Sequence, residues 1–159
     1  MTARSLFIWK VHRTLSSAWT GQHRVSIPAD RMVVVTEASR MLTELAREMS
    51  ATYIAQVRPR AILLTGSAAA GTSDAFSDLD LILYYEHPPA PEQLTAVRAT
   101  LQASNVRVTL DADTGSGIEE YVHQGVECQV AHLAIATWER DMRAVLEECE
   151  PATLVEKAI

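Results

Sequence analysis

Hydrophobic residues recur at three- and four-residue steps from residue 36 to residue 57, and this period predicts one apolar face of a long helix. Thr36 is suited to cap the start of this helix, and Pro59 ends it. Two short apolar runs follow at 61–65 and 79–85, and we predict strands there. The first half of the chain is therefore expected to form a helix followed by two strands.

The second half of the chain alternates between breaks and regular patterns. Pro91 is placed to open a helix that runs to about residue 103. A last helix is expected from about residue 138 to residue 149, with Thr137 as its cap. Three further strands are predicted, at 106–110, 119–123 and 126–133, the last two forming a hairpin around Gln124-Gly125. Together these elements predict an α/β or α+β domain, with a mixed sheet of about five strands flanked by helices.

Charge divides the chain into two parts. Residues 1–31 carry five basic side chains and one acidic one, about +4, whereas the remainder carries nine basic and nineteen acidic ones, about −10. We expect 1–31 to be a poorly defined arm, the alternatives being a basic targeting leader or an extension upstream of a natural start at Met32. The main domain is expected over 32–150, and 151–159 is expected to begin a further, truncated helical element.

Composition narrows the class of protein. The 159 residues are 48% hydrophobic and 21% charged, which suits one globular domain with a proper core. The net charge of −6 argues against a general nucleic-acid binder. Two cysteines cannot form a disulfide framework or a cysteine-based zinc site, and no apolar run approaches the roughly 20 residues of a membrane span. We therefore expect a cytoplasmic protein without a membrane segment.

The chemistry of the chain is concentrated between the first two predicted strands. Gly66-Ser67 ends the first strand, and Asp78 and Asp80 begin the second. Residues two apart on a strand point to the same face, so the two carboxylates lie close together and repel each other unless a cation sits between them. Mg²⁺ prefers such oxygen ligands. Gly66 lets the backbone approach a phosphate closely, and Ser67 adds a hydroxyl and a backbone N–H.

This order of motifs resembles the signature of the DNA polymerase beta-like nucleotidyltransferase superfamily, especially its small bacterial members and the aminoglycoside nucleotidyltransferases. In this chain the signature is Gly66-Ser67, ten residues, and then Asp78-Leu79-Asp80. The resemblance covers about residues 36–150, although its specific part is 64–83. It implies a nucleotidyltransferase fold that binds two Mg²⁺ ions and uses ATP or another nucleoside triphosphate, with Gly66 and Ser67 gripping the triphosphate.

The resemblance also implies a third carboxylate on a neighbouring strand. The candidate is Glu127, which alternation places on one face with Gln129, while Cys128 and Val130 point to the other. Its role would be to bind the catalytic metal and to help deprotonate the acceptor hydroxyl. The alternative is an ordinary exposed strand glutamate. Asp78, Asp80 and Glu127 are thus the expected catalytic and metal-binding residues.

One position departs from the family pattern. Many relatives carry an arginine in the loop just before the glycine matched by Gly71, where this chain has Ala70. An expected triphosphate contact is then missing, and either activity is weaker or Arg107 or another chain supplies the charge. Asp74, in the same loop, is expected to form a turn rather than to bind a metal. Elsewhere, we expect His132 to be structural and Trp138 to belong to the core.

Two functions remain open at this stage. The first is transfer of a nucleoside monophosphate, with AMP as the expected group, to a hydroxyl of a small molecule or a protein. Nucleic acid is the less expected acceptor because the domain is acidic. The second is a catalytically weakened, antitoxin-like nucleotide-binding partner in a two-component module. A homodimer or a partner subunit that completes the substrate pocket is compatible with both.

Overall fold

The computed structural model describes residues 7–9, 35–111, 114 and 116–145. The segment 151–159 and all of the arm 1–31 except the strand Phe7–Trp9 lie outside these ranges, so the domain boundaries expected from the sequence stay predictions. No helix in the described part of the chain is long and apolar enough to cross a membrane.

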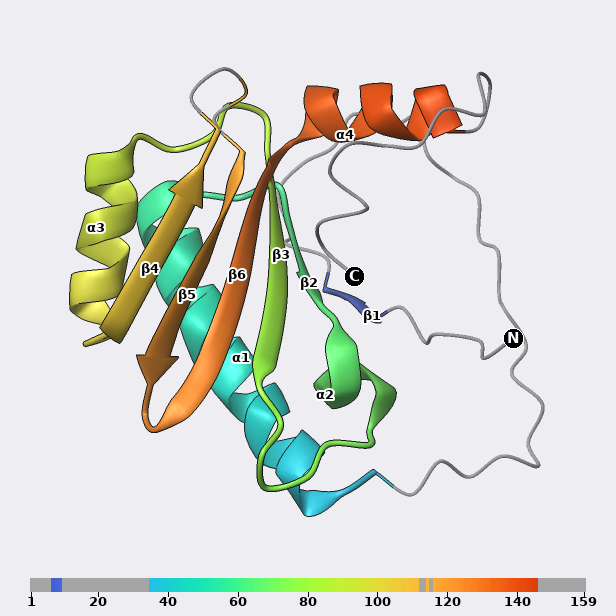
Figure 1. Ribbon diagram of the computed structural model, residues 1–159, viewed down its shortest axis with the longest axis vertical. Coiled ribbons are helices and arrows are strands. Elements are labelled where there is room, and N and C mark those ends of the chain that lie inside the picture. The colour runs from blue at the N-terminus through green and yellow to red at the C-terminus, as the bar shows by residue number, and fades with distance from the viewer. Residues whose placement is uncertain (1–6, 10–34, 112–113, 115, 146–159) are drawn as a thin grey trace.

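The described residues form one mixed sheet with helices packed on it, which confirms the predicted α+β architecture (Figure 1). The sheet order is β1-β2-β3-β6-β5-β4, and every neighbouring pair is antiparallel except the parallel pair β3–β6. The strands are β1 Phe7–Trp9, β2 Ala61–Leu64, β3 Leu79–Tyr85, β4 Ser104–Leu110, β5 Gly117–His123 and β6 Val126–Ala134. The helices are α1 Glu37–Val57, α2 Gly66–Ala70, α3 Pro91–Thr100 and α4 Ile135–Arg143.

Helix α1 begins and ends where its sequence predicts. The Thr36 side chain accepts a hydrogen bond from the backbone N–H of Ser39, which is the usual N-cap arrangement. Arg58 takes a left-handed conformation after the last turn, and Pro59 prevents the helix from continuing. Of the apolar residues predicted to share one face, Leu42, Leu45, Met49 and Tyr53 are buried. Met41 and Ile54, predicted on the same face, are exposed instead, so the buried stripe is narrower than expected.

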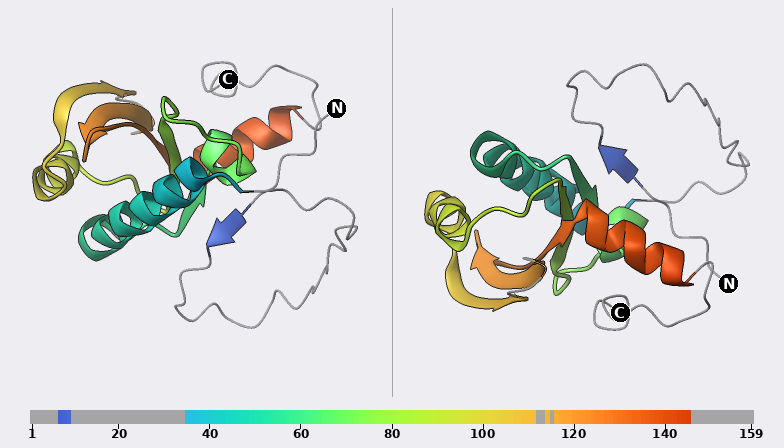
Figure 2. Two further views of the ribbon diagram at one scale, coloured as in Figure 1. Left: turned by 90° about the horizontal axis from the view of Figure 1, so that it is seen from below. Right: turned by 90° about the horizontal axis from the view of Figure 1, so that it is seen from above.

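The sheet has one covered face and one open face, and this difference positions the site. Along β3 the burial alternates strictly, so that Leu79, Leu81, Leu83 and Tyr85 lie in the core beneath α1 and α3. Figure 2 shows both helices on the same side of the sheet. Asp80 and the other even-numbered residues of β3 point to the opposite, more open face.

The last helix differs from the prediction. It begins at Ile135, directly after β6, rather than at residue 138, and its predicted end at residue 149 lies outside the described residues. Thr137 is buried within the first turn instead of capping it. Trp138 is 41% exposed and is not a core residue, although its ring meets Tyr84 edge-on at 5.8 Å. This contact places α4 over the end of the open face that lies far from Asp80.

Candidate active site

Asp78 and Asp80 share the open face of the sheet, as their spacing predicts. Leu79 between them is fully buried, whereas Asp78 is exposed and Asp80 is partly buried at the start of β3. Burial, and then the negative charge of Asp78, raise the pKa of the Asp80 carboxyl above its ordinary value. The two carboxylates therefore repel each other where Asp80 is partly removed from solvent. A bound cation would relieve this repulsion.

Gly66 lies directly against the Asp80 carboxylate. A Cβ built at Gly66 would stand 2.1 Å from Asp80 Oδ2, and Gly66 has φ +64°. The backbone N–H of Thr65 also donates to the Asp80 carbonyl at 3.0 Å, which fixes the turn against β3. Both the space and the left-handed backbone therefore require glycine here. The Gly-Ser turn and the Asp-x-Asp pair thus form one packed unit.

Glu127 is brought beside the aspartates by the parallel pairing of β3 with β6. Leu79 pairs with Cys128 and Asp80 with Gln129, so Glu127 follows in register with Asp78. Glu127 is exposed and Gln129 partly exposed, while Cys128 is buried, which confirms the predicted alternation of this strand. Asp78 and Glu127 line the same cavity, of about 540 Å³.

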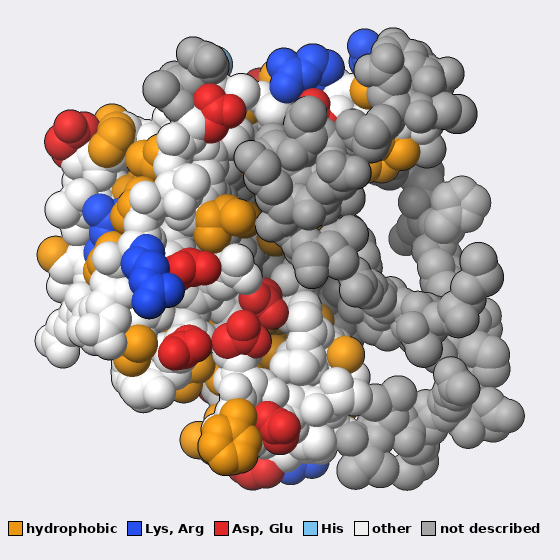
Figure 3. Space-filling view, viewed as in Figure 1, with side chains coloured by type: hydrophobic (Ala, Val, Ile, Leu, Met, Phe, Trp, Pro, Cys, Tyr) orange, Lys and Arg blue, Asp and Glu red, His pale blue; other side chains and the backbone are white. Residues whose placement is uncertain are grey.

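The carboxylates do not all converge on one point. The electrostatic effect of Asp78 on Asp80 shows that these two are close, and the shared cavity joins Asp78 to Glu127. Within the described ranges, no three carboxylate, cysteine or histidine side chains are near enough to hold a single ion together. Figure 3, viewed as in Figure 1, shows Asp and Glu side chains gathered on the lower half of the open face, with a basic side chain beside them.

Ser67 is held by a chain of hydroxyl groups that the sequence analysis missed. Its Oγ lies 3.1 Å from Ser73 Oγ, and the backbone N–H of Ser73 donates to Ser39 Oγ at 2.9 Å. Ser39 Oγ, in the first turn of α1, also lies 2.9 Å from Thr36 Oγ1. Thr36 forms a further bond of 2.7 Å, as donor to the Ser73 carbonyl. The start of α1 therefore holds the loop that orients Ser67.

Ser39→Ala is expected to lower the free energy of unfolding by about 1–3 kcal/mol, because the buried N–H of Ser73 loses its acceptor. Urea denaturation measures this loss. Ser50→Ala, at a partly exposed position of α1, controls for the gain in helix propensity that alanine brings. Equal stability of the two variants would show that the hydroxyl chain does not hold the loop.

Asp74 forms a turn, as expected. Its Oδ1 accepts from the backbone N–H of Phe76 at 3.0 Å and from Ser77 Oγ at 2.9 Å. The hydrogen bond from Phe76, followed by that from Ser77, lowers the pKa of the Asp74 carboxyl. These bonds use one carboxylate oxygen within its own loop, which supports a structural role.

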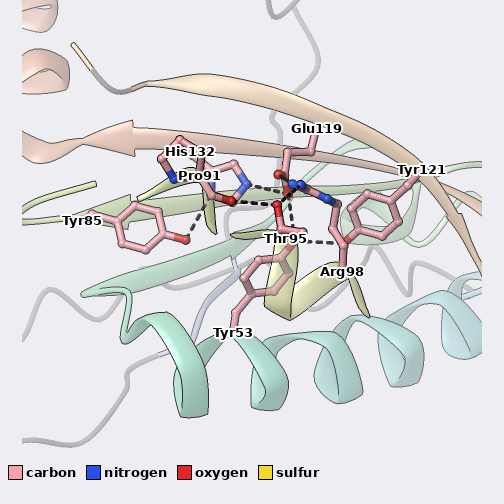
Figure 4. A network of polar contacts seen from close by, with 8 residues as sticks. All are labelled: Tyr53, Tyr85, Pro91, Thr95, Arg98, Glu119, Tyr121 and His132. Atoms are coloured by element: carbon pink, nitrogen blue, oxygen red, sulfur yellow. Dashed lines mark hydrogen bonds and ion pairs between the residues drawn. The ribbon is translucent and has the colours of Figure 1, made fainter. Parts of the chain in front are cut away.

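A second polar cluster lies on the covered face of the sheet, behind the site (Figure 4). Glu119 and His132 are fully buried, with His132 Nε2 3.2 Å from Glu119 Oε2, although this contact lacks the alignment of a good hydrogen bond. Arg98 of α3 forms an ion pair with Glu119 through Nη1. His132 is therefore structural, as predicted, and the buried charge of Glu119 is compensated by Arg98.

Three tyrosines complete this cluster. Tyr53 Oη lies 2.9 Å from Tyr121 Oη and 3.5 Å from Glu119 Oε2, and Tyr85 Oη lies 3.1 Å from His132 Nδ1. Burial is the largest cause that raises the pKa of each of these tyrosines. All three are nearly inaccessible, so the cluster binds α1 and α3 to the sheet and offers no surface to a substrate. The sequence contains one signal for a buried acid here, the pair Glu119-Glu120. Because consecutive strand residues point to opposite faces, one of the two must face the core.

Comparisons with known proteins give weak similarities. No family model matches the chain, and no curated protein matches it. Among solved structures, mtPAP with ATPγS has 18% identity and a TM-score of 0.44, covering 61% of this chain and 26% of that one. The Cid1 poly(U) polymerase bound to MgGTP has 11% identity and a TM-score of 0.48, covering 62% and 33%. The GLD-2/RNP-8 complex has 20% identity and a TM-score of 0.39, covering 67% and 45%.

The match therefore spans about a quarter to just under half of the length of these structures. The similarity is too low to assign a function. Any functional assignment therefore rests on the residues of this chain.

Proposed function

We propose that this protein is a nucleotidyltransferase that moves a nucleoside monophosphate from a nucleoside triphosphate to a hydroxyl group. The observation that supports this most is the packing of the Gly66 turn against Asp80, with Glu127 in register beside Asp78. A phosphate-binding turn next to clustered carboxylates is what such a transfer requires. The order of these motifs along the chain is also that of the polymerase beta-like superfamily.

The donor set fits Mg²⁺. Asp78 and Asp80 provide hard oxygen ligands within mutual electrostatic influence, and Glu127 provides another from the adjacent strand. These three residues would hold two Mg²⁺ ions, which when bound supply charge neutralisation for the triphosphate and lower the pKa of the attacking hydroxyl. Ser67 and Gly66, on the other side of Asp80, would bind the triphosphate oxygens.

Each side chain has a separate role in the proposed transfer. The acceptor hydroxyl oxygen forms a bond to the α-phosphorus while the bond from that phosphorus to the bridging oxygen breaks, so that pyrophosphate leaves. Glu127, exposed in the cavity, accepts the proton of the hydroxyl. Gly66 and Ser67 keep the triphosphate in line for this attack. ATP is the proposed donor, and the proposed acceptor is a small molecule or a protein.

A second function is a catalytically weakened nucleotide-binding partner. The observation that favours it is Ala70, which stands just before Gly71 at the position where many relatives place an arginine. Ala70 is exposed at the end of α2, and its methyl group carries no charge that could contact a phosphate. Under this alternative, the protein would bind its partner tightly, bind nucleotide and show no turnover.

Asp80→Asn is expected to reduce label transfer from α-labelled ATP by at least about 100-fold, because it removes one carboxylate from the metal-binding pair. The assay uses Mg²⁺, α-labelled ATP and fractionated cell extract as the source of acceptor, with pyrophosphate release as the second measurement. EDTA should abolish both signals in the wild type.

Glu86→Gln is the matched control, since Glu86 is an exposed acid just after the other end of β3. It should behave like the wild type. If the wild type transfers no more label than Asp80→Asn, the enzymatic proposal is wrong, and nucleotide binding without turnover would favour the second function.

A further inference from the structure

Strand β4 forms one edge of the sheet (Figure 1), and the described part of the chain places no strand beyond it. All seven of its residues, Ser104–Leu110, are exposed. They include large aliphatic side chains, since Val106 and Val108 are each 41% exposed and Leu110 is 38% exposed. Proteins commonly protect such an edge with a proline, a lysine or a very short strand, and β4 has none of these. Its outer side is therefore open to pairing with another strand.

The backbone groups that face this open side belong to Val108 and Leu110. The backbone N–H of Asp111 donates to the Ser116 carbonyl at 2.8 Å, so the ladder between β4 and β5 continues one residue beyond the strand. Because the direction of hydrogen bonding alternates along an antiparallel strand, the N–H and C=O groups of Val108 and Leu110 point away from β5. A bulge shifts the register just before Arg107. The regular part of the edge thus begins at Arg107 and ends at Asp111.

The sequence of this regular part is complementary to itself in the antiparallel direction. It reads Arg-Val-Thr-Leu-Asp from Arg107 to Asp111. About a two-fold axis at Thr109, Arg107 of one copy stands opposite Asp111 of the other. Val108 stands opposite Leu110 in the same way. The charged pairs share the open face of the sheet with Thr109, and the apolar pairs share the covered face. Opposite charges and aliphatic side chains placed directly across an antiparallel pair stabilise it.

Other antiparallel registers of β4 with a second copy are less favourable. A register centred on Arg107 places two guanidinium groups directly opposite each other, which is destabilising. A register centred on Val108 leaves the two guanidinium groups as diagonal neighbours, about 7–8 Å apart. A register centred on Val106 uses the bulge, where Asn105 has φ +54° and the regular ladder is interrupted. The register centred on Thr109 avoids the bulge and gives each guanidinium a carboxylate.

Both charged groups can form these pairs and keep the contacts that they already make. Arg107 Nη1 lies 3.7 Å from Glu120 Oε2, and the two side chains are 84% and 50% exposed, so the guanidinium can bridge two carboxylates. Asp111 Oδ1 accepts from the backbone N–H of Thr114 at 3.3 Å, and a carboxylate accepts several hydrogen bonds at once. The backbone of Arg107 is three strand spacings, about 14 Å, from that of Asp80. Its charge is therefore not part of the turn that would bind the triphosphate.

We propose that the protein forms a two-fold symmetric homodimer, in which β4 pairs with β4 of a second copy in the antiparallel register centred on Thr109. The two sheets then become one continuous sheet, and each Val108–Leu110 pair across the interface exchanges both of its backbone hydrogen bonds. A second copy is favoured over an unrelated strand because both members of each ion pair come from this chain. The inference goes beyond the proposed function, since no residue of this interface is assigned to catalysis.

Sedimentation equilibrium of the full chain measures the association constant. We expect the wild type to dimerise as its concentration rises. Arg107→Asp should weaken dimerisation at least about tenfold, because both ion pairs of the dimer become repulsive pairs of carboxylates. Addition of Asp111→Arg to this variant should restore dimerisation, since each pair again joins opposite charges. Recovery in the double variant distinguishes a lost interface from damage to the fold.

Arg60→Asp is the matched control. It changes the net charge by the same amount and disrupts another exposed ion pair, in which Arg60 Nε lies 3.8 Å from Glu86 Oε2. Its association constant should be close to that of the wild type. A chain that stays monomeric at every concentration overturns the inference, and so does one that dimerises equally well with Arg107→Asp.

Cysteine cross-linking tests the register. The background is Cys149→Ser, and Cys128 is buried. Thr109→Cys should form an intermolecular disulfide on mild oxidation, because the two copies of this residue meet at the axis as a non-hydrogen-bonded pair, whose side chains are closest. Val108→Cys should form little, since its two copies are only diagonal neighbours. A disulfide through Val108→Cys with none through Thr109→Cys would overturn the inference.

Discussion

Gly66→Ala is expected to abolish nucleotidyl transfer, because the new methyl group would occupy the place of the Asp80 carboxylate. The added Cβ would lie 2.1 Å from Asp80 Oδ2, so Asp80 or the turn has to move. The left-handed backbone at φ +64° adds a cost of about 1–2 kcal/mol for any residue other than glycine. The measurements are label transfer from α-labelled ATP and the free energy of unfolding in urea.

Gly125→Ala provides a matched control within the same chain. Gly125 has φ +81° in the turn between β5 and β6, and nothing lies within 4 Å of the Cβ that alanine would add. This variant therefore carries the backbone cost without the contact at Asp80. We expect it to lose a similar amount of stability through the backbone alone and to keep its activity. Equal activities in the two variants would mean that the position of Asp80 does not depend on Gly66.

Glu119→Ala should lower the free energy of unfolding by about 3–5 kcal/mol, a large part of the stability of a domain of this size. Glu119 is fully buried and pairs with Arg98, whose side chain is only 15% exposed. Removing the carboxylate leaves this guanidinium and His132 without their partner. Urea unfolding monitored by circular dichroism measures the loss.

Glu120→Ala is the control, because Glu120 is the next residue on β5 and faces the solvent side of the sheet. It should change stability by no more than about 0.5 kcal/mol. A double variant, Glu119→Leu with Arg98→Met, should be closer to the wild type than Glu119→Ala, since an apolar pair leaves no buried charge. The interpretation fails if Glu119→Ala and Glu120→Ala unfold at the same urea concentration.

Much of the fold could be predicted because its signals are local. The cap at Thr36, the stop at Pro59 and the turn at Gln124-Gly125 each depend on a few adjacent residues. The start of α4 could not be predicted in the same way. Thr137 has the chemistry of a cap, yet β6 continues directly into the helix, and Thr137 is buried in the first turn. Packing against the sheet outweighed a weak local preference.

The candidate site was predictable in its chemistry more than in its arrangement. Alternation along each strand predicts which face of the sheet Asp80 and Glu127 lie on. It does not predict that their two strands are parallel neighbours. The cluster around Glu119 was not foreseen, because its partners Arg98 and Tyr53 come from separate helices and no short motif connects them. Contacts between distant parts of the chain have no local signature.

The parallel pairing of β3 with β6 also has a consequence for how the protein folds. Leu79 meets Cys128 only after the whole segment between them has folded back, whereas β5 and β6 form their hairpin through one short turn. Because distant pairings carry the larger loop-closure cost, the hairpin is expected to form before β6 docks on β3. Asp78 and Glu127 then become neighbours only in this late step. A divalent ion held by these two carboxylates would bind the native state and not its precursors, and would oppose unfolding by favouring the non-local pairing of β3 with β6.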